Sequence, residues 1–247
     1  GTKLVGAPYA GYQVLICNTR VPPLDRVELR KALSLAINRR SIIDDLLLGY
    51  AHEPRSSIAP TDAFYDPDLP PLPYDPEQAR QLLQEAGYQG EVIIIEALER
   101  EIPLVQAVAA MWSEVGVNTE IRQIESAVRS QKIRDNAFEG VFPAAPGSSV
   151  GDPDGMMFRT MGRGGLWGGV WENEEFNRLG NEARHLLDDE QRRQRYRRMD
   201  EIITREVVPW IVLYQKEDLY GLQDWIEWQP HPQLRMNFRR ENLSITG

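Results

Sequence analysis

The sequence predicts an α/β fold in which a mixed sheet is flanked by helices. The first observation is a strand–helix–strand–helix–strand order between residues 91 and 144, which is typical of βαβ units. The second is a set of amphipathic helical stripes on both sides of that stretch. The third is a chain of 247 residues, 42% of them apolar, which is long enough to bury a sizeable core.

The first 50 residues predict one strand followed by two helices. Residues 12–18 are rich in β-formers and predict a buried strand. Residues 21–24 form an extended connector, because proline restricts both itself and the preceding residue. Asp25 is expected to cap the first helix, and a short second helix is expected at about 41–48. The stripe of the first helix consists of Leu29, Ala32, Leu33, Ala36 and Ile37.

A well-delimited helix follows a long proline-rich stretch. Residues 52–73 hold six prolines, which exclude helices and central strands, so this stretch is expected to wrap along the core. Asp75 then caps a helix with Pro76 at its first position, and Gly87 supplies the left-handed stop. The apolar face of this helix consists of Ala79, Leu82, Leu83 and Ala86.

The rest of the chain continues the alternation. Three strands are expected at 91–96, 117–124 and 138–144, the first of them buried on both faces. After an irregular region, helices are expected at about 174–187 and 190–207. Their stripes are Phe176, Leu179, Ala183, Leu186 and Leu187, then Tyr196, Met199, Ile202, Ile203 and Val207. A strand at 209–214 leads into a tail whose Trp225 and Trp228 are expected to be exposed and to pack on something beyond this chain.

The composition excludes several classes of function. A net charge of −9 argues against binding to nucleic acid or to an anionic membrane surface. No run of about 18 apolar residues is available to span a bilayer. Cys17 is the single cysteine, so no internal disulfide can form, and its apolar neighbours predict a buried, inert thiol. The chain starts at Gly1 without a methionine or a leader, which predicts a piece cut from a longer protein.

Asp152-Pro153-Asp154-Gly155 places two carboxylates in a glycine-rich loop. Three readings are open: Asp152 caps a short helix at 156–161, the loop contacts a ligand, or the pair serves a metal or acid–base chemistry. The further oxygen ligands of a calcium loop are missing, and the three histidines lack metal-ligand spacing. We therefore expect neither a metal nor a cofactor.

Residues 162–171 combine glycines with Trp167 and Trp171. Glycines let a backbone approach a ligand closely, and aromatic rings offer flat contact area. The stretch therefore predicts either part of a small-molecule site or a surface loop whose tryptophans fill the core.

Seven segments, in order, resemble the C-terminal half of the family 5 extracellular solute-binding proteins, the dipeptide and oligopeptide receptors of ABC importers. The most specific is Tyr74-Asp75-Pro76-Glu77 with Ala86-Gly87-Tyr88 at the end of the same helix. The segments are residues 12–18, 27–39, 74–88, 151–154, 171–179, 189–196 and 208–214.

This resemblance implies the C-terminal lobe of a type-II periplasmic-binding-protein-like fold, in which a ligand lies between two hinged lobes. Residues 1–24 would be a hinge and crossing strand, 25–207 the ligand-binding lobe, and 208–247 a returning strand and tail towards a missing N-terminal lobe. The implied function is capture of a peptide or other polar solute and its delivery to a membrane permease. The implied location is extracytoplasmic, either periplasmic or as a cell-surface lipoprotein, and no catalysis is expected.

The resemblance also implies an aspartate shortly before the Asp152 loop that holds a peptide's amino terminus. Ser149 stands there, and a neutral serine cannot pair with an ammonium as a carboxylate does, so the ligand could be a peptide, a sugar or another polar solute. Arg100 follows the end of a strand, where ligands of open α/β sheets lie. The expected ligand contacts are Trp167, Trp171, Asp152, Ser149 and Arg100. A hydrolase using Asp152 and Asp154, or a sensing domain of a regulator, are the competing hypotheses.

Overall fold

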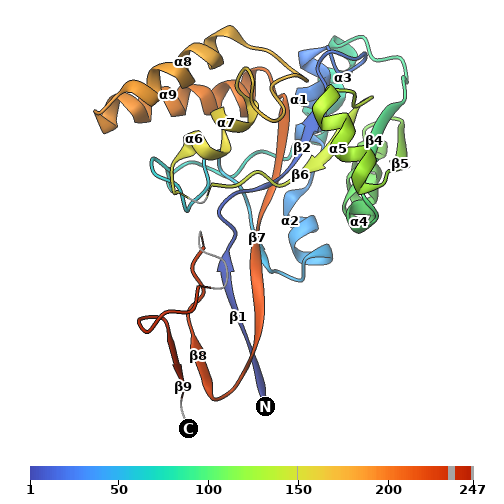
Figure 1. Cartoon of the computed structure of the whole chain (residues 1–247). Helices are drawn as coiled ribbons and strands as arrows, with labels where there is room; N and C mark the ends of the chain where they lie inside the picture. The colour runs from blue at the N-terminus through green and yellow to red at the C-terminus, as the bar shows by residue number, and fades with distance from the viewer. Residues whose placement is uncertain (149, 233–236, 246–247) are drawn as a thin grey trace.

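The structure is a computed structural model that describes residues 1–148, 150–232 and 237–245 (Figure 1). The strands are β1 (Thr2–Pro8), β2 (Gln13–Cys17), β3 (Ala51–His52), β4 (Ile93–Ala97), β5 (Thr119–Gln123), β6 (Val141–Ala144), β7 (Trp210–Gln223), β8 (Ile226–Trp228) and β9 (Leu243–Ile245). The helices are α1 (Val27–Leu35), α2 (Arg39–Ser41), α3 (Pro76–Glu85), α4 (Ile102–Glu114), α5 (Ser126–Asp135), α6 (Pro153–Met156), α7 (Phe158–Met161), α8 (Glu174–His185) and α9 (Asp189–Glu201). Shorter helical turns lie at Ile42–Leu46, Glu99–Glu101 and Ile202–Glu206.

The main sheet is mixed and has the strand order β1-β7-β2-β6-β4-β5, with β3 also paired to β7. β7 belongs to two regions: its first residues pair antiparallel with β2, and its second half pairs antiparallel with β1. The β1–β7 pair extends from the main body of the structure as a two-stranded ribbon that ends near the N-terminus (Figure 1). The mixed α/β fold predicted from the sequence is confirmed.

The parallel strands give the sheet two distinct ends. β4 pairs parallel with β5 and with β6, whereas β6 pairs antiparallel with β2, so that Ala144 lies opposite Val14 and Val141 opposite Cys17. Because β2 begins next to the ribbon, the carboxyl ends of β4, β5 and β6 also face the ribbon. We call this end the carboxyl edge and the opposite end, next to Cys17, the amino edge.

The two faces of the sheet build two apolar cores, as the period of two along each strand requires. Leu15 and Cys17 of β2 point into a core covered by α1, α3 and α4, whereas Val14 and Ile16 point into a core covered by α6 to α9. Cys17 is fully buried, and burial raises the pKa of its thiol to about 12, which confirms the predicted buried, inert cysteine.

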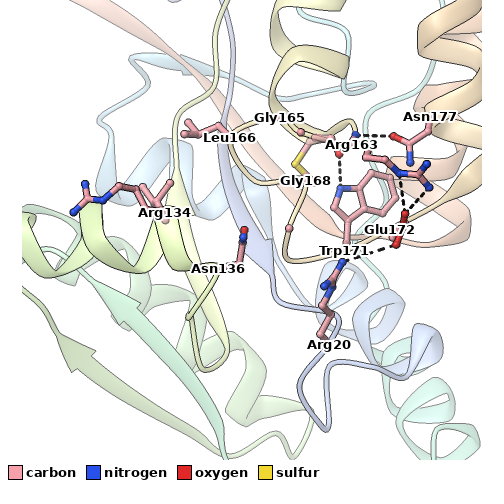
Figure 2. A pocket seen from close by; sticks show the side chains of 14 residues that line it. Arg20, Arg134, Asn136, Arg163, Gly165, Leu166, Gly168, Trp171, Glu172 and Asn177 are labelled. Carbon is pink, nitrogen blue, oxygen red and sulfur yellow. Dashed lines mark hydrogen bonds and ion pairs between the residues drawn. The ribbon is translucent and has the colours of Figure 1, made fainter.

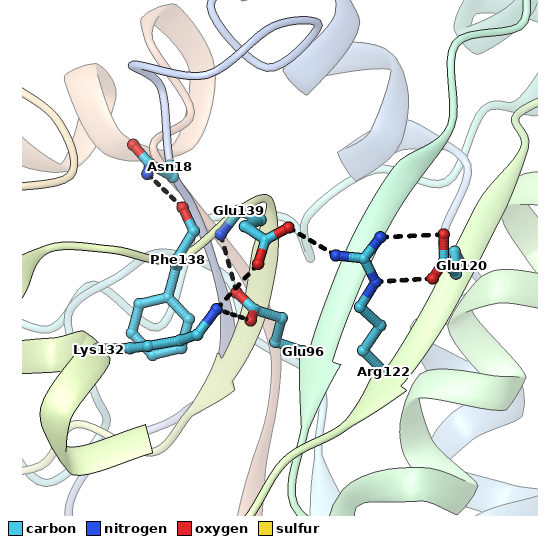
Figure 3. A network of polar contacts seen from close by, with 7 residues as sticks. All are labelled: Asn18, Glu96, Glu120, Arg122, Lys132, Phe138 and Glu139. Atoms are coloured by element: carbon cyan, nitrogen blue, oxygen red, sulfur yellow. Dashed lines mark hydrogen bonds and ion pairs between the residues drawn. The ribbon is translucent and has the colours of Figure 1, made fainter. Parts of the chain in front are cut away.

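A charged network fastens β4, β5 and α5 to the start of β6 (Figure 3). The Glu96 carboxylate, only 1% exposed, binds the Lys132 ammonium and accepts a hydrogen bond from the Glu139 amide at 2.8 Å. The Glu139 carboxylate lies 3.1 Å from the Lys132 ammonium and 2.6 Å from the Arg122 guanidinium, which also binds Glu120 at 2.7 Å.

The helix predicted from Asp75 to Gly87 is confirmed in detail. The Asp75 carboxylate accepts a hydrogen bond from the Gln78 amide at 2.9 Å, and Gly87 has a φ of 64°. The predicted cap at Asp25 is wrong, because α1 begins at Val27 with no side-chain cap. Asp25 lies instead within a turn in which the Arg26 amide donates to the Pro23 carbonyl at 3.2 Å.

The predicted tail also differs from the structure. The strand expected at 209–214 extends to Gln223, because its second half finds β1 as a partner. Trp228 is 5% exposed, so its predicted exposure is wrong: its ring packs edge-on against Tyr220, with ring centres 4.8 Å apart, and its indole N–H donates to the Asn237 carbonyl at 2.9 Å. Trp225 is 49% exposed, in agreement with the prediction.

Candidate functional site

At the carboxyl edge, Arg100 lies in the helical turn that follows β4, and its side chain is 74% exposed. The next residue, Glu101, accepts two hydrogen bonds from the Arg129 guanidinium, both at 2.7 Å, and one from the Leu98 amide at 3.0 Å. Arg129 also donates to the Pro143 carbonyl of β6. The Glu101–Arg129 pair therefore fixes the turn, while the Arg100 guanidinium, 3.9 Å from Glu101, points outward with capacity to bind an anionic group.

The loop after β6 lies against the base of the ribbon. The Ser148 amide donates to the Ala10 carbonyl at 2.7 Å, and the Tyr9 hydroxyl donates to the Ala145 carbonyl at 2.8 Å. Gly11 has to be glycine here, because a Cβ at this position would lie 2.0 Å from the Pro146 carbonyl oxygen. The loop that leads to Asp152 is thus coupled to the base of the β1–β7 ribbon.

Asp152 and Asp154 are both engaged in ion pairs. The Asp152 carboxylate accepts from the Asp154 amide at 3.0 Å, which makes it the cap of α6, and binds the Arg192 guanidinium at 2.6 Å. The Asp154 carboxylate binds Arg184 through two hydrogen bonds of 2.7 and 3.0 Å. Asp152 is confirmed as a helix cap, but the helix that it caps is α6 at Pro153–Met156 and not the helix expected at 156–161. Both carboxylates hold guanidinium groups rather than facing each other as an acid–base pair.

Asp62 lies in a second segment next to the Asp152 loop, and no pattern in the sequence indicates its role. Its side chain is buried, and neither carboxylate oxygen has a hydrogen-bond partner among the described residues. Burial, and to a lesser extent the charge of Asp152, raise the pKa of the Asp62 carboxyl to about 7. The two loops are also joined through the backbone, since the Ala63 amide donates to the Gly151 carbonyl at 2.8 Å.

Trp167 and Trp171 lie at the amino edge, away from Asp152 and Arg100. Trp167 is 7% exposed and Trp171 1% exposed, and the Trp171 indole N–H donates to the Met161 carbonyl at 2.8 Å. The neighbouring Val170 carbonyl accepts from the Thr19 amide, just beyond the end of β2. This placement favours the interpretation in which the tryptophans fill the core.

A pocket of about 520 Å³ lies at the amino edge, and Trp171 and Arg20 are among the residues that line it (Figure 2). Figure 2 shows the Arg163 and Arg20 guanidinium groups directed at the Glu172 carboxylate, which they approach to 2.6 and 3.9 Å. The Arg134 side chain extends away from them (Figure 2). The glycine-rich loop is packed tightly here, because a Cβ at Gly169 would lie 1.9 Å from the Asn136 side-chain oxygen.

The structure thus separates the predicted contacts into two groups. Arg100 and Asp152 share the carboxyl edge, Trp167 and Trp171 lie at the amino edge, and Ser149 lies outside the described residues. Sequence reasoning missed Asp62, which no local pattern marks, and also the Arg192 side chain that pairs with Asp152. Within the described ranges, no helix is long and apolar enough to cross a bilayer, and no group of three or more metal-ligating side chains comes together.

The fold defines the class of protein: a mixed α/β sheet with helices on both faces, in which the loops that follow the parallel strands lie beside a two-stranded ribbon. The chain belongs to the bacterial extracellular solute-binding proteins, family 5, whose middle-region model matches residues 1–166. The resemblance seen in the ordered motifs is thereby confirmed.

Relatives of known designation agree with this assignment. The heme-binding protein A of Haemophilus influenzae is 28% identical over 206 residues, which is 78% of this chain and 37% of that protein. The dipeptide-binding protein of Escherichia coli is 27% identical over 224 residues, which is 85% of this chain and 41% of that protein. The chain therefore spans well under half the length of these relatives.

Solved structures show the same fold. HbpA2 from Haemophilus parasuis superposes with a TM-score of 0.85 at 22% identity, over 99% of this chain and 50% of that chain. The oligopeptide-binding protein AppA from Bacillus subtilis, solved with a nonapeptide, gives a TM-score of 0.81 at 18% identity, over 100% of this chain and 53% of that chain.

Proposed function

We propose that this chain is the C-terminal lobe of the substrate-binding component of an ABC importer, and that it captures a peptide-like or other polar solute without catalysis. The observation that carries the proposal is that the two segments described at the carboxyl edge, the turn with Arg100 and the loop after β6, lie on the side of the sheet where the β1–β7 ribbon begins. A ligand held between lobes would meet these segments first, and lobe closure around it would be a hinge motion.

The crossing segments support a second lobe. Residues 1–24 and 208–247 would connect to it, and residues 25–207 would form the ligand-binding lobe. Leu4 and Leu219 of the ribbon are 52% and 39% exposed, which is apolar surface that a second lobe would cover. The relatives, which are more than twice as long as their matched parts, have room for such a lobe.

The ligand contacts follow from the charges at the carboxyl edge. Arg100 would bind a carboxylate of the solute, because its guanidinium is exposed and lies 3.9 Å from Glu101, whose carboxylate is already bound by Arg129. The Asp152 loop, including Ser149, would contact the other end of the solute. Trp167 and Trp171 would stabilise the lobe by filling its core near the amino edge. The protein would lie outside the cytoplasm and would deliver the solute to a permease in the membrane.

Calorimetry of the chain against dipeptides, longer peptides and sugars tests this function. We expect binding of a dipeptide that weakens about tenfold or more in Arg100→Gln, from the loss of one charged hydrogen-bonding partner. Arg40→Gln, which removes another exposed charge from α2, should leave binding unchanged. Release of a cleaved product that disappears in Asp152→Asn would overturn the receptor assignment in favour of a hydrolase.

A further inference from the structure

A second feature of the carboxyl edge is a cavity of about 590 Å³ directly beyond β6, which we call the Arg159 pocket. Its volume lies within the range of small-molecule sites. α6 and α7 form one wall, and α8 and α9 contribute the other through single arginines. Its polar lining consists of Ser148, Asp152, Asp154, Arg159, Arg184 and Arg192.

The pocket has one cation more than it has anions. Arg192 is paired with Asp152 and Arg184 with Asp154, as described above. Arg159 is exposed, and its Nε donates to the Gly155 carbonyl at 3.2 Å. Among the described residues, no carboxylate lies within ion-pair distance of its guanidinium. The two terminal nitrogens of Arg159 therefore keep the forked geometry that matches a carboxylate.

The base of the pocket supplies a hydroxyl. Ser148 is only 2% exposed, and its Oγ accepts a hydrogen bond from the Val150 amide at 3.3 Å. Within the described part of the chain, its hydroxyl proton has no acceptor. Gly155 makes room for it, because a Cβ there would lie 2.7 Å from the Ser148 Oγ. A buried hydroxyl with an unused proton favours an acceptor arriving from outside the chain.

The paired arginines are held in place before any ligand arrives. The Arg184 guanidinium lies 4.6 Å from the centre of the Phe158 ring, and that of Arg192 lies 5.5 and 5.6 Å from the Phe64 and Tyr196 rings. Stacking of this kind holds Arg184 and Arg192 in their ion pairs. Arg159 is therefore the arginine of the pocket that can bind the carboxylate of an incoming ligand.

We propose that the Arg159 pocket is a subsite for a second carboxylate of the bound solute, such as an acidic side chain of a peptide. The carboxylate oxygens accept from the Arg159 terminal nitrogens and from the Ser148 hydroxyl. This assignment rests on the proposed solute-binding function, and it adds a preference for acidic solutes that Arg100 alone does not impose.

The test is a titration of the isotope-labelled chain, followed by NMR chemical shifts, with glycyl-glutamate, glycyl-glutamine, glutarate and inorganic phosphate. We expect glycyl-glutamate to bind about tenfold more tightly than glycyl-glutamine, and Arg159→Gln to abolish that difference. Ser148→Ala should reduce it. Arg134→Gln, an equal loss of charge at the amino edge, should leave it intact.

Each other outcome has a defined meaning. Equal affinity for the two dipeptides would overturn the subsite and leave the receptor function standing. Binding of glutarate alone, lost in Arg159→Gln, would support the subsite and overturn the peptide-receptor function. Tighter binding of phosphate than of glutarate at Arg159 would overturn the carboxylate assignment, and no binding of any probe would overturn both proposals.

Discussion

Replacing Asp62 by asparagine is expected to stabilise the protein above neutral pH. Asp62 is 6% exposed, has no hydrogen-bond partner for either carboxylate oxygen among the described residues, and lies near the charge of Asp152. An ionised carboxylate in such a place costs far more free energy than a neutral carboxyl group does. Asparagine has the shape of the neutral carboxyl group and cannot ionise.

The size of the effect follows from the two pKa values. The pKa of Asp62 is 3.8 without the influence of the fold and about 7 in the folded protein. The folded state therefore binds more protons between these values, so the free energy of unfolding falls as the pH rises from about 4 to about 7. At about 1.4 kcal/mol for each pKa unit, this loss is about 4 kcal/mol, and water entering the loop would reduce it to roughly 2 kcal/mol.

Urea unfolding of the wild type and Asp62→Asn between pH 4 and pH 8 measures this directly. The two proteins should be equally stable at about pH 4 and should diverge as the pH rises, with the variant more stable by roughly 2–4 kcal/mol at about pH 8. Asp68→Asn, on an exposed side chain of the same proline-rich stretch, is the matched control and should follow the wild type. Equal stability of wild type and Asp62→Asn at pH 8 would refute the reasoning.

Two further variants test local interactions. Lys132→Met is expected to lower the free energy of unfolding by about 3 kcal/mol, because it leaves the buried Glu96 carboxylate without its cation. Adding Glu96→Gln should recover most of that loss in a double-mutant cycle, and an undiminished loss in the double variant would contradict the pairing. Asp75→Ala should cost about 1 kcal/mol through the lost cap of α3, as urea unfolding would measure. Asp75→Asn keeps a capping oxygen and should be nearly neutral; a similar loss in both variants would argue against the cap.

Local signals in the sequence were sufficient wherever a helix or strand is defined by its own residues. The Asp75 cap, the proline after it and the stop at Gly87 predict α3 almost to the residue. The stripe from Leu29 to Ile37 is fully buried in the core that α1 shares with the sheet. Such predictions succeed because capping and helical periodicity act over a few residues only.

The sequence misled where a longer-range partner decides the outcome. Helical periodicity predicts Leu187 on the apolar stripe of α8, but the helix ends at His185 and Leu187 is 99% exposed. The strand at 209–214 doubles in length only because β1 returns from the other end of the chain. Trp228 is buried by Tyr220 and Phe238, and no period along the chain could have indicated those neighbours.

The α/β class, the positions of most helices and strands, and membership of family 5 can be predicted from the chain alone, since these depend on local patterns and their order. Which side chains share a site depends on how the strands pair in three dimensions. The register of β6 against β2 places Arg100 and Asp152 at the edge beside the ribbon and leaves Trp171 at the opposite edge. It also brings Asp62 and Arg159 to the same edge as Asp152, because the pairing of strands, and not their spacing along the chain, sets which loops meet.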